Sequence, residues 1–277
     1  MPCPIDLDVS RINHLKVITP MDATFYIVAV LAVILVGFGK GGMGDVLGLL
    51  GVPILSFVMP SVQAAAILLP ILVVMDIIAL WTWRAHWNRQ TLMFVLPGAL
   101  IGIAIGWTTF YVVPDYVMRL LIGIVALSFT GRYFYNRYLA GNVDRPPRRN
   151  EPVRATIWST LSGYGSFIAH AGGAPYQVYA LPLKLSPKEY TGTAVRFFAI
   201  INALKLPPYY MLGLLSVGNL QTSAMLAPVA LLATLAGAAV VKRMRIEVFY
   251  PWMYGMLLLA GLKLAWDGLR PLVAMTL

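Results

Sequence analysis

The stretch His170-Ala-Gly-Gly-Ala-Pro-Tyr176 lies between apolar segments, and Gly37-Phe-Gly-Lys-Gly-Gly-Met-Gly-Asp45 is its counterpart in the first half of the chain. Glycine and proline interrupt helices, and an interruption inside a bilayer leaves backbone N–H and C=O groups without partners. Such a break is costly unless it lines a cavity within the protein that holds something polar. The two stretches therefore predict two broken or re-entrant membrane helices around a polar site.

The overall composition supports a membrane location. Hydrophobic residues make up 59% of the chain and charged residues only 12%, whereas soluble domains have about 25% charged residues. The formal net charge is +10. Many basic residues lie in the short gaps between apolar runs, which is the positive-inside pattern and argues against nucleic acid as a partner. These gaps contain Arg84, Arg89, Arg132, Arg137, Arg145, Arg148, Arg149, Arg154, Lys242, Arg243 and Arg245.

The apolar runs predict an all-α, polytopic membrane protein. Runs close to the roughly 20 residues that cross a bilayer lie at 62–82, 91–110, 117–136, 189–212, 220–241 and 248–269. Two further regions, 23–59 and 155–184, each contain an apolar run, a glycine-rich break and a shorter apolar run. Each of these regions is either one crossing plus a half-helix or a re-entrant hairpin. We therefore expect about eight transmembrane helices.

The two halves of the chain resemble each other. An ungapped shift places Gly37-Phe38-Gly39 over Gly163-Tyr164-Gly165, and Asp76 over Asn202. The gap after 62–82 is basic, whereas the corresponding gap at 213–221 carries no charge. The halves therefore run oppositely through the membrane, as in transporters with inverted repeats. We predict one membrane transporter domain over 1–277, with repeats at about 20–137 and 155–271 and a basic cytoplasmic linker at about 138–154.

Motifs in both halves point to a family. The first half contains Lys40-Gly-Gly-Met-Gly44, Pro53, Leu69-Pro70 and Asp76; the second contains His170-Ala-Gly-Gly-Ala-Pro-Tyr176, Tyr179-Ala-Leu-Pro182, Tyr190-Thr-Gly-Thr193, Phe197-Phe198, Asn202 and Lys205-Leu-Pro-Pro-Tyr209. With these motifs the chain resembles the TauE/SafE family of sulfite exporters and related anion permeases. It departs from the commoner motif at Ala174, where a second proline often precedes Pro175.

The resemblance implies a transporter in the inner membrane rather than an enzyme, with no cofactor. Its substrate would be sulfite, thiosulfate, a sulfonate such as sulfoacetate, or an organic acid. A permease for another small anion remains the alternative, and an intramembrane enzyme or assembly factor that binds a lipid headgroup or a peptide is a second class. Partners would be the anion and membrane lipids, and a homo-oligomer is compatible with the sequence. Cys3 is the single cysteine and the three histidines lie in separate regions, so no metal site is expected.

In the first break, Lys40 is the principal candidate for binding an anion. Backbone N–H groups at Gly41 and Gly42 and the positive end of a half-helix near Asp45 would assist it. A charge inside a membrane is rarely idle. The alternatives are a lysine that snorkels to the interface or one that pairs with Asp45 for structural reasons.

In the second break, the candidates are His170, Gly172, Gly173 and Pro175. The glycines would form a matching cradle before a half-helix near Pro175, or would serve close helix packing. His170 would donate to the solute or act as a proton-linked switch. A structural histidine bonded to a backbone carbonyl is the competing interpretation.

The predicted helix at 189–212 separates its polar residues onto two faces. A period of 3.6 residues places Thr191 and Phe198 near one stripe with Asn202 and Lys205. Thr193 and Arg196 lie on roughly the opposite side. Thr193 and Asn202, both candidate substrate contacts, would therefore not line one small pocket. Asn202 is the deeper of the two and is the preferred candidate.

Four residues are candidates for coupling or gating: Asp45, Asp76, Arg196 and Lys205. Asp76 would carry a coupling proton or pair with a basic residue. We expect Arg196 to face a cytoplasmic vestibule. Lys205 precedes Pro207-Pro208, which should bend or end the helix and place this lysine at the far rim of the site.

Overall fold

The computed structural model describes residues 23–43, 45–110, 115–139 and 146–276. Within these ranges all regular structure is helical, which confirms the expected all-α class. The helices are α1 (Ala23–Phe38), η2 (Gly39–Met43), η3 (Asp45–Leu50), α2 (Gly51–Leu55), α3 (Ser61–Thr82), α4 (Arg89–Thr109), α5 (Asp115–Phe134), η4 (Tyr135–Leu139), α6 (Pro152–Ala169), α7 (Gly173–Ala180), η5 (Leu181–Leu183), α8 (Pro187–Met211), α9 (Val217–Arg243) and α10 (Ile246–Thr276).

Several helices are long and apolar enough to cross a membrane. In the described part of the chain, 5 segments meet this criterion by length and composition: Ala23–Gly42, Ser61–Thr82, Arg89–Thr109, Val217–Arg243 and Ile246–Pro271. Large apolar side chains such as Ile77, Trp81 and Ile101 are exposed on the outside of the bundle. Because so much exposed apolar surface is unfavourable in water, it indicates contact with lipid. The chain is a multi-pass membrane protein.

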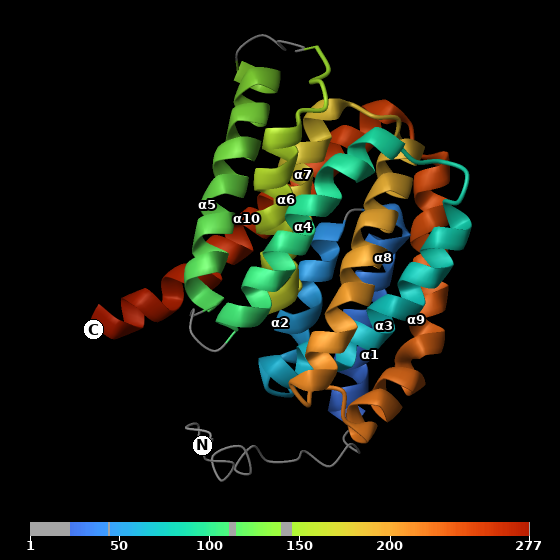
Figure 1. The fold of residues 1–277 in the computed structure, drawn as a ribbon, viewed down its shortest axis with the longest axis vertical. Helices are drawn as coiled ribbons and strands as arrows, with labels where there is room; N and C mark the ends of the chain where they lie inside the picture. The colour runs from blue at the N-terminus through green and yellow to red at the C-terminus, as the bar shows by residue number, and fades with distance from the viewer. Residues whose placement is uncertain (1–22, 44, 111–114, 140–145, 277) are drawn as a thin grey trace, which may run out of the picture.

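Most helices before residue 140 pack against helices after it (Figure 1). In the figure, α5 and α10 run together on one side of the bundle, while α4 packs along α6, and α1 and α3 along α9. The α4–α6 contact is close, because a Cβ at Gly102 would lie only 2.1 Å from the Thr160 carbonyl oxygen. Small residues allow this kind of backbone approach between membrane helices.

The helical path is interrupted in both glycine stretches. After Phe38 the chain continues as the π-helical turn η2, in which Gly42 has a φ of 127°. After Ala169 the chain turns at His170, whose φ of 51° is left-handed, and α7 begins at Gly173. Both interruptions lead into short helices, η3 and α2 in one case and α7 in the other. Lys40 and the start of α7 are thereby placed in the interior of the bundle.

Candidate functional site

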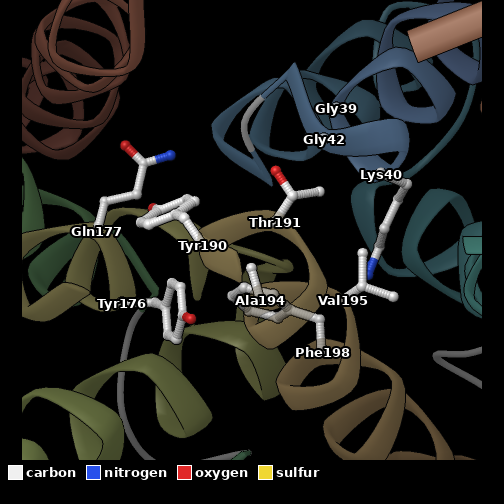
Figure 2. Close-up of a pocket in the computed structure, with 10 residues that line it drawn as sticks. All are labelled: Gly39, Lys40, Gly42, Tyr176, Gln177, Tyr190, Thr191, Ala194, Val195 and Phe198. Atoms are coloured by element: carbon white, nitrogen blue, oxygen red, sulfur yellow. The ribbon is translucent and has the colours of Figure 1, made fainter. Parts of the chain in front are cut away.

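A small cavity lies between η2, α7 and α8 (Figure 2). Its volume is about 20 Å³, which accommodates about one water molecule. An oxyanion with four heavy atoms needs more room than this cavity offers in the conformation described. Its lining residues are Gly39, Lys40, Gly42, Tyr176, Gln177, Tyr190, Thr191, Ala194, Val195 and Phe198.

Gln177 and Thr191, in the cavity wall, have polar side-chain atoms that make no hydrogen bond to any other residue that the structure describes. Gln177 on α7 is 1% exposed and Thr191 on α8 is 2% exposed. The amide nitrogen and oxygen of Gln177 and the hydroxyl of Thr191 make no hydrogen bond to another described residue. Leaving a buried polar group unsatisfied costs about 1–3 kcal/mol, which is a reason to expect a ligand here. Figure 2 shows Gln177 on one side of the cavity and Lys40 on the other, with Thr191 and Phe198 between them.

Lys40 is held in a buried ion pair beside this cavity. Its Nζ lies 2.9 Å from Oδ1 of Asp76 on α3, and both side chains are 4% exposed. The other carboxylate oxygen, Oδ2, accepts a hydrogen bond of 2.5 Å from Nδ2 of Asn202 on α8. Lys40 also lies over the Phe198 ring, 5.2 Å from its centroid. Lys40 therefore does not snorkel to the surface, and Asp76 is an acidic partner of its ammonium group. The side chain of Asp45 lies outside the part of the structure that is described.

The shape of η2 fixes the position of Lys40. Trp83 donates from Nε1 to the Gly41 carbonyl oxygen at 3.0 Å. A Cβ at Gly41 would lie 2.4 Å from the Thr234 carbonyl oxygen, so this glycine serves close packing on α9. At Gly42, a Cβ would lie 2.6 Å from Cγ2 of Thr191. Its positive φ also favours glycine, so Gly42 is needed for both the turn and the cavity.

The second interruption contains a separate polar cluster. His170 lies with Nε2 3.2 Å from the Ala65 carbonyl oxygen and Nδ1 3.0 Å from Nζ of Lys205. Because a carbonyl oxygen can only accept, Nε2 carries the hydrogen and Nδ1 accepts from Lys205. Lys205 donates in addition to the carbonyl and hydroxyl oxygens of Ser166, each at 3.1 Å. His170 thus has the backbone-bonded arrangement that was one of its two expected states.

The position of Lys205 differs from the sequence expectation. This side chain is 0% exposed rather than at a rim. The reason is that α8 continues through Pro207 and Pro208 and ends only at Met211. Proline removes a helical hydrogen bond, but packing by neighbouring helices allows membrane helices to continue through it.

The glycines of the second interruption pack against α6. A Cβ at Gly172 would lie 2.6 Å from the Ser162 carbonyl oxygen, and Oγ of Ser162 donates to the Gly172 carbonyl oxygen at 2.7 Å. Gly173 and Pro175 lie in the first turn of α7, where both are buried. None of these three residues lines the small cavity.

Thr193 and Arg196 lie on another face of α8, as the helical period predicted. Thr193 accepts a hydrogen bond of 2.8 Å from the backbone N–H of Asn88. Arg196 donates to the carbonyl oxygens of Trp83 and Arg84 at 3.2 and 2.8 Å. These contacts tie α8 to the connection between α3 and α4, away from the residues that line the small cavity.

Four polar residues of the cavity wall were not among the candidates predicted from the sequence: Tyr176, Gln177, Tyr190 and Thr191. Tyr176, Tyr190 and Thr191 lie in the family motifs, and Thr191 also lies on the face of α8 that carries Asn202. None of the three had a predicted role. Gln177 had a local signal, because it is the single residue with a polar amide in the otherwise largely apolar α7. All eight residues of α7 are buried, and a buried amide needs partners.

The fold and this cavity define a multi-pass helical membrane protein with a buried polar site between η2, α7 and α8. A family model described as sulfite exporter TauE/SafE matches residues 29–264, a range that includes both interruptions and every residue of the cavity. The chain belongs to the TauE/SafE family, which is a family of membrane transporters. No curated protein and no solved structure matched the chain.

Proposed function

We propose that the protein exports a small sulfur-containing anion, such as sulfite or a sulfonate, across the inner membrane. The observation that carries this proposal is the pair of unpartnered polar groups, on Gln177 and Thr191, in a cavity beside Lys40. An oxygen-rich anion needs several donors to replace its water shell, and an ammonium, an amide and a hydroxyl supply them. Family membership independently favours an anion of this class.

We propose that the cavity opens alternately to the two sides of the membrane. In this proposal about eight transmembrane helices form two inverted repeats, at about 20–137 and 155–271, joined by a cytoplasmic linker. The interruptions at η2 and before α7 would lie near the midplane, which is where transporters of this plan bind their solutes. The one-water volume of the cavity supports a closed, substrate-free conformation as the one described here.

The Lys40–Asp76 pair provides a coupling mechanism in this proposal. An anion in the cavity and the Asp76 carboxylate compete for the same ammonium group, so anion binding loosens the pair. A proton on Asp76 would remove the competition. Moving one negative charge out of an inside-negative cell gains roughly 2.3 kcal/mol per 100 mV. Export therefore needs no coupling ion, whereas uptake would require one, for which Asp45 and Asp76 are the candidates.

We propose different roles for the remaining candidates according to their contacts. Asn202 would orient Asp76, to which it is bonded. His170 and Lys205 join α6 to α8 through Ser166, and Arg196 joins α8 to the end of α3. These three residues would act as gating contacts that break when the cavity opens.

Removing the unpartnered groups tests the proposal. We expect Gln177→Leu and Thr191→Val each to raise the KM for sulfite about tenfold or more, because each removes a hydrogen bond to a charged ligand, worth about 1.5–3 kcal/mol. Neither change should lower the Tm, because each removes a buried polar atom that makes no hydrogen bond to another described residue. The measurement is flux of radiolabelled sulfite in proteoliposomes, with thermal unfolding of the same samples.

The matched control is Gln221→Leu, which removes an exposed amide on α9 and should leave KM unchanged. Competition by thiosulfate, sulfoacetate and a keto acid against sulfite then identifies the preferred anion. Wild-type protein that carries none of these anions would overturn the proposal, as would an unchanged KM in both cavity variants.

A further inference from the structure

A second, larger cavity lies apart from the proposed transport site. Its volume is about 520 Å³, within the range of about 300–1,000 Å³ that is typical of ligand pockets. It is enclosed by α5 and η4, the part of the linker from Pro146 onward, the first turns of α6, the end of α7 with η5, and the start of α10. The two cavities share no lining residue: on α7, Gln177 lines the small cavity and Val178 the large one.

Basic side chains converge on this larger cavity. Among the described residues, its wall contains one acidic side chain, Glu247, together with Arg132, Arg137, Arg148, Arg154 and Lys184. The positive-inside rule explains why basic residues gather on one side of a membrane. It does not explain why residues from five separate segments gather around one hollow, so their arrangement points to an anionic ligand.

Arg154 provides the strongest individual evidence. One of its terminal nitrogens, Nη2, donates to the Val178 carbonyl oxygen at 2.8 Å. The other, Nη1, is buried and makes no hydrogen bond to another described residue. A buried charged donor without an acceptor is unfavourable, and an acceptor bound in the cavity would satisfy it.

Aromatic side chains form much of the remaining wall. Tyr133 on α5 and Tyr254 on α10 stack with ring centroids 3.5 Å apart, and Phe129 stacks on Tyr254 at 5.6 Å. Trp158 and Tyr250 also line the cavity. The wall therefore offers apolar surface next to the guanidinium groups, which fits a ligand with a charged group and a larger, less polar remainder.

We propose that this cavity binds a phosphate ester, either a free organic phosphate or the headgroup of an anionic phospholipid. Guanidinium groups match the tetrahedral oxygens of phosphate and bind them through paired hydrogen bonds. A cavity of this size is far larger than an anion such as sulfite requires. Anionic lipids are also attracted to basic residues at the cytoplasmic surface of a membrane, so the same chemistry has a soluble and a lipid source.

Binding measurements on the full-length protein in phosphatidylcholine nanodiscs test this proposal. In one arm, sn-glycerol 3-phosphate is titrated by calorimetry. In the other, phosphatidylglycerol is added to the discs and retained lipid is counted by native mass spectrometry. We expect at least one probe to bind, and Arg148→Gln and Arg154→Gln each to weaken that binding about tenfold. Binding of glycerol 3-phosphate alone identifies a soluble ligand, and retention of phosphatidylglycerol alone identifies a lipid.

The control is Arg89→Gln, which removes an exposed arginine at the start of α4, outside the cavity. Arg148 is itself exposed, so its variant tests the cavity even if Arg154→Gln disturbs the contact between α6 and α7. The proposal is wrong if neither probe binds, or if Arg89→Gln weakens binding as much as Arg148→Gln. It is also wrong if sulfite displaces the probe as readily as glycerol 3-phosphate does, which would make this cavity a vestibule for the transported anion.

Discussion

Lys40→Met should abolish anion flux and lower the free energy of unfolding by about 3–5 kcal/mol, the usual effect of removing one partner from a buried ion pair. The loss of stability arises because the Asp76 carboxylate is left in the protein interior with a hydrogen bond from Asn202 and without the ammonium at 2.9 Å. The loss of flux arises because the cavity loses its positive charge. Radiolabelled flux in proteoliposomes and denaturant unfolding in detergent measure the two effects.

A double variant separates the two effects. In Lys40→Met/Asp76→Asn neither member of the pair is charged, so we expect most of the lost stability to return while flux remains absent. Lys263→Met is the control, because Lys263 also pairs with an acidic residue, Asp267, but 39% of its side chain is exposed. This variant should keep the wild-type flux, because Lys263 does not line the small cavity. Flux in the double variant close to that of the wild type would show that Lys40 has only a structural role.

Gly42→Ala should have the second largest effect on transport. A β-carbon at this position meets Cγ2 of Thr191 at 2.6 Å and must adopt a φ of 127°. Holding a non-glycine residue in such a conformation costs about 1–3 kcal/mol. If η2 or α8 moved to relieve this contact and strain, Lys40 or Thr191 would be displaced from the cavity wall. We therefore expect both a lower Tm and a flux reduced by about tenfold or more, which corresponds to at least about 1.4 kcal/mol.

Gly213→Ala is the matched control for backbone strain. Gly213 also has a positive φ, 69°, but a Cβ there meets nothing within 4 Å. This variant should lose some stability and keep the wild-type KM for sulfite. If Gly42→Ala behaves in the same way, the close contact between η2 and Thr191 has no part in forming the site.

The positions of the long helices follow from local sequence. The apolar run at 62–82 became α3, Ser61–Thr82, because bilayer thickness fixes the length of a crossing segment and polar residues mark its ends. The helical period of α8 correctly separated Thr193 and Arg196 from Asn202. The prolines at the end of α8 were misleading, because packing by neighbouring helices outweighs the local preference of proline.

The partners of the candidate residues depended on tertiary structure. Lys40 had two acidic candidates, the nearby Asp45 and the distant Asp76, and no local rule chooses between them. The structure brings α3 beside η2 and pairs Lys40 with Asp76, 36 residues along the chain. Gln177 had a local signal as the single amide in the short apolar helix α7, but whether its side chain has a partner depends on tertiary structure.

Helices from the first half of the chain pack mainly against helices from the second half, so these contacts form only after the second half is synthesised. The apolar cluster around α1 and α3 is completed by Leu226 and Ala230 of α9, and α5 packs against α10. While the ribosome is still producing the second half, the inserted helices α1 to α5 have lipid where these partners will later dock. A chain that stops at the linker would therefore lack α7 and α8, which contribute most of the residues that line the small cavity.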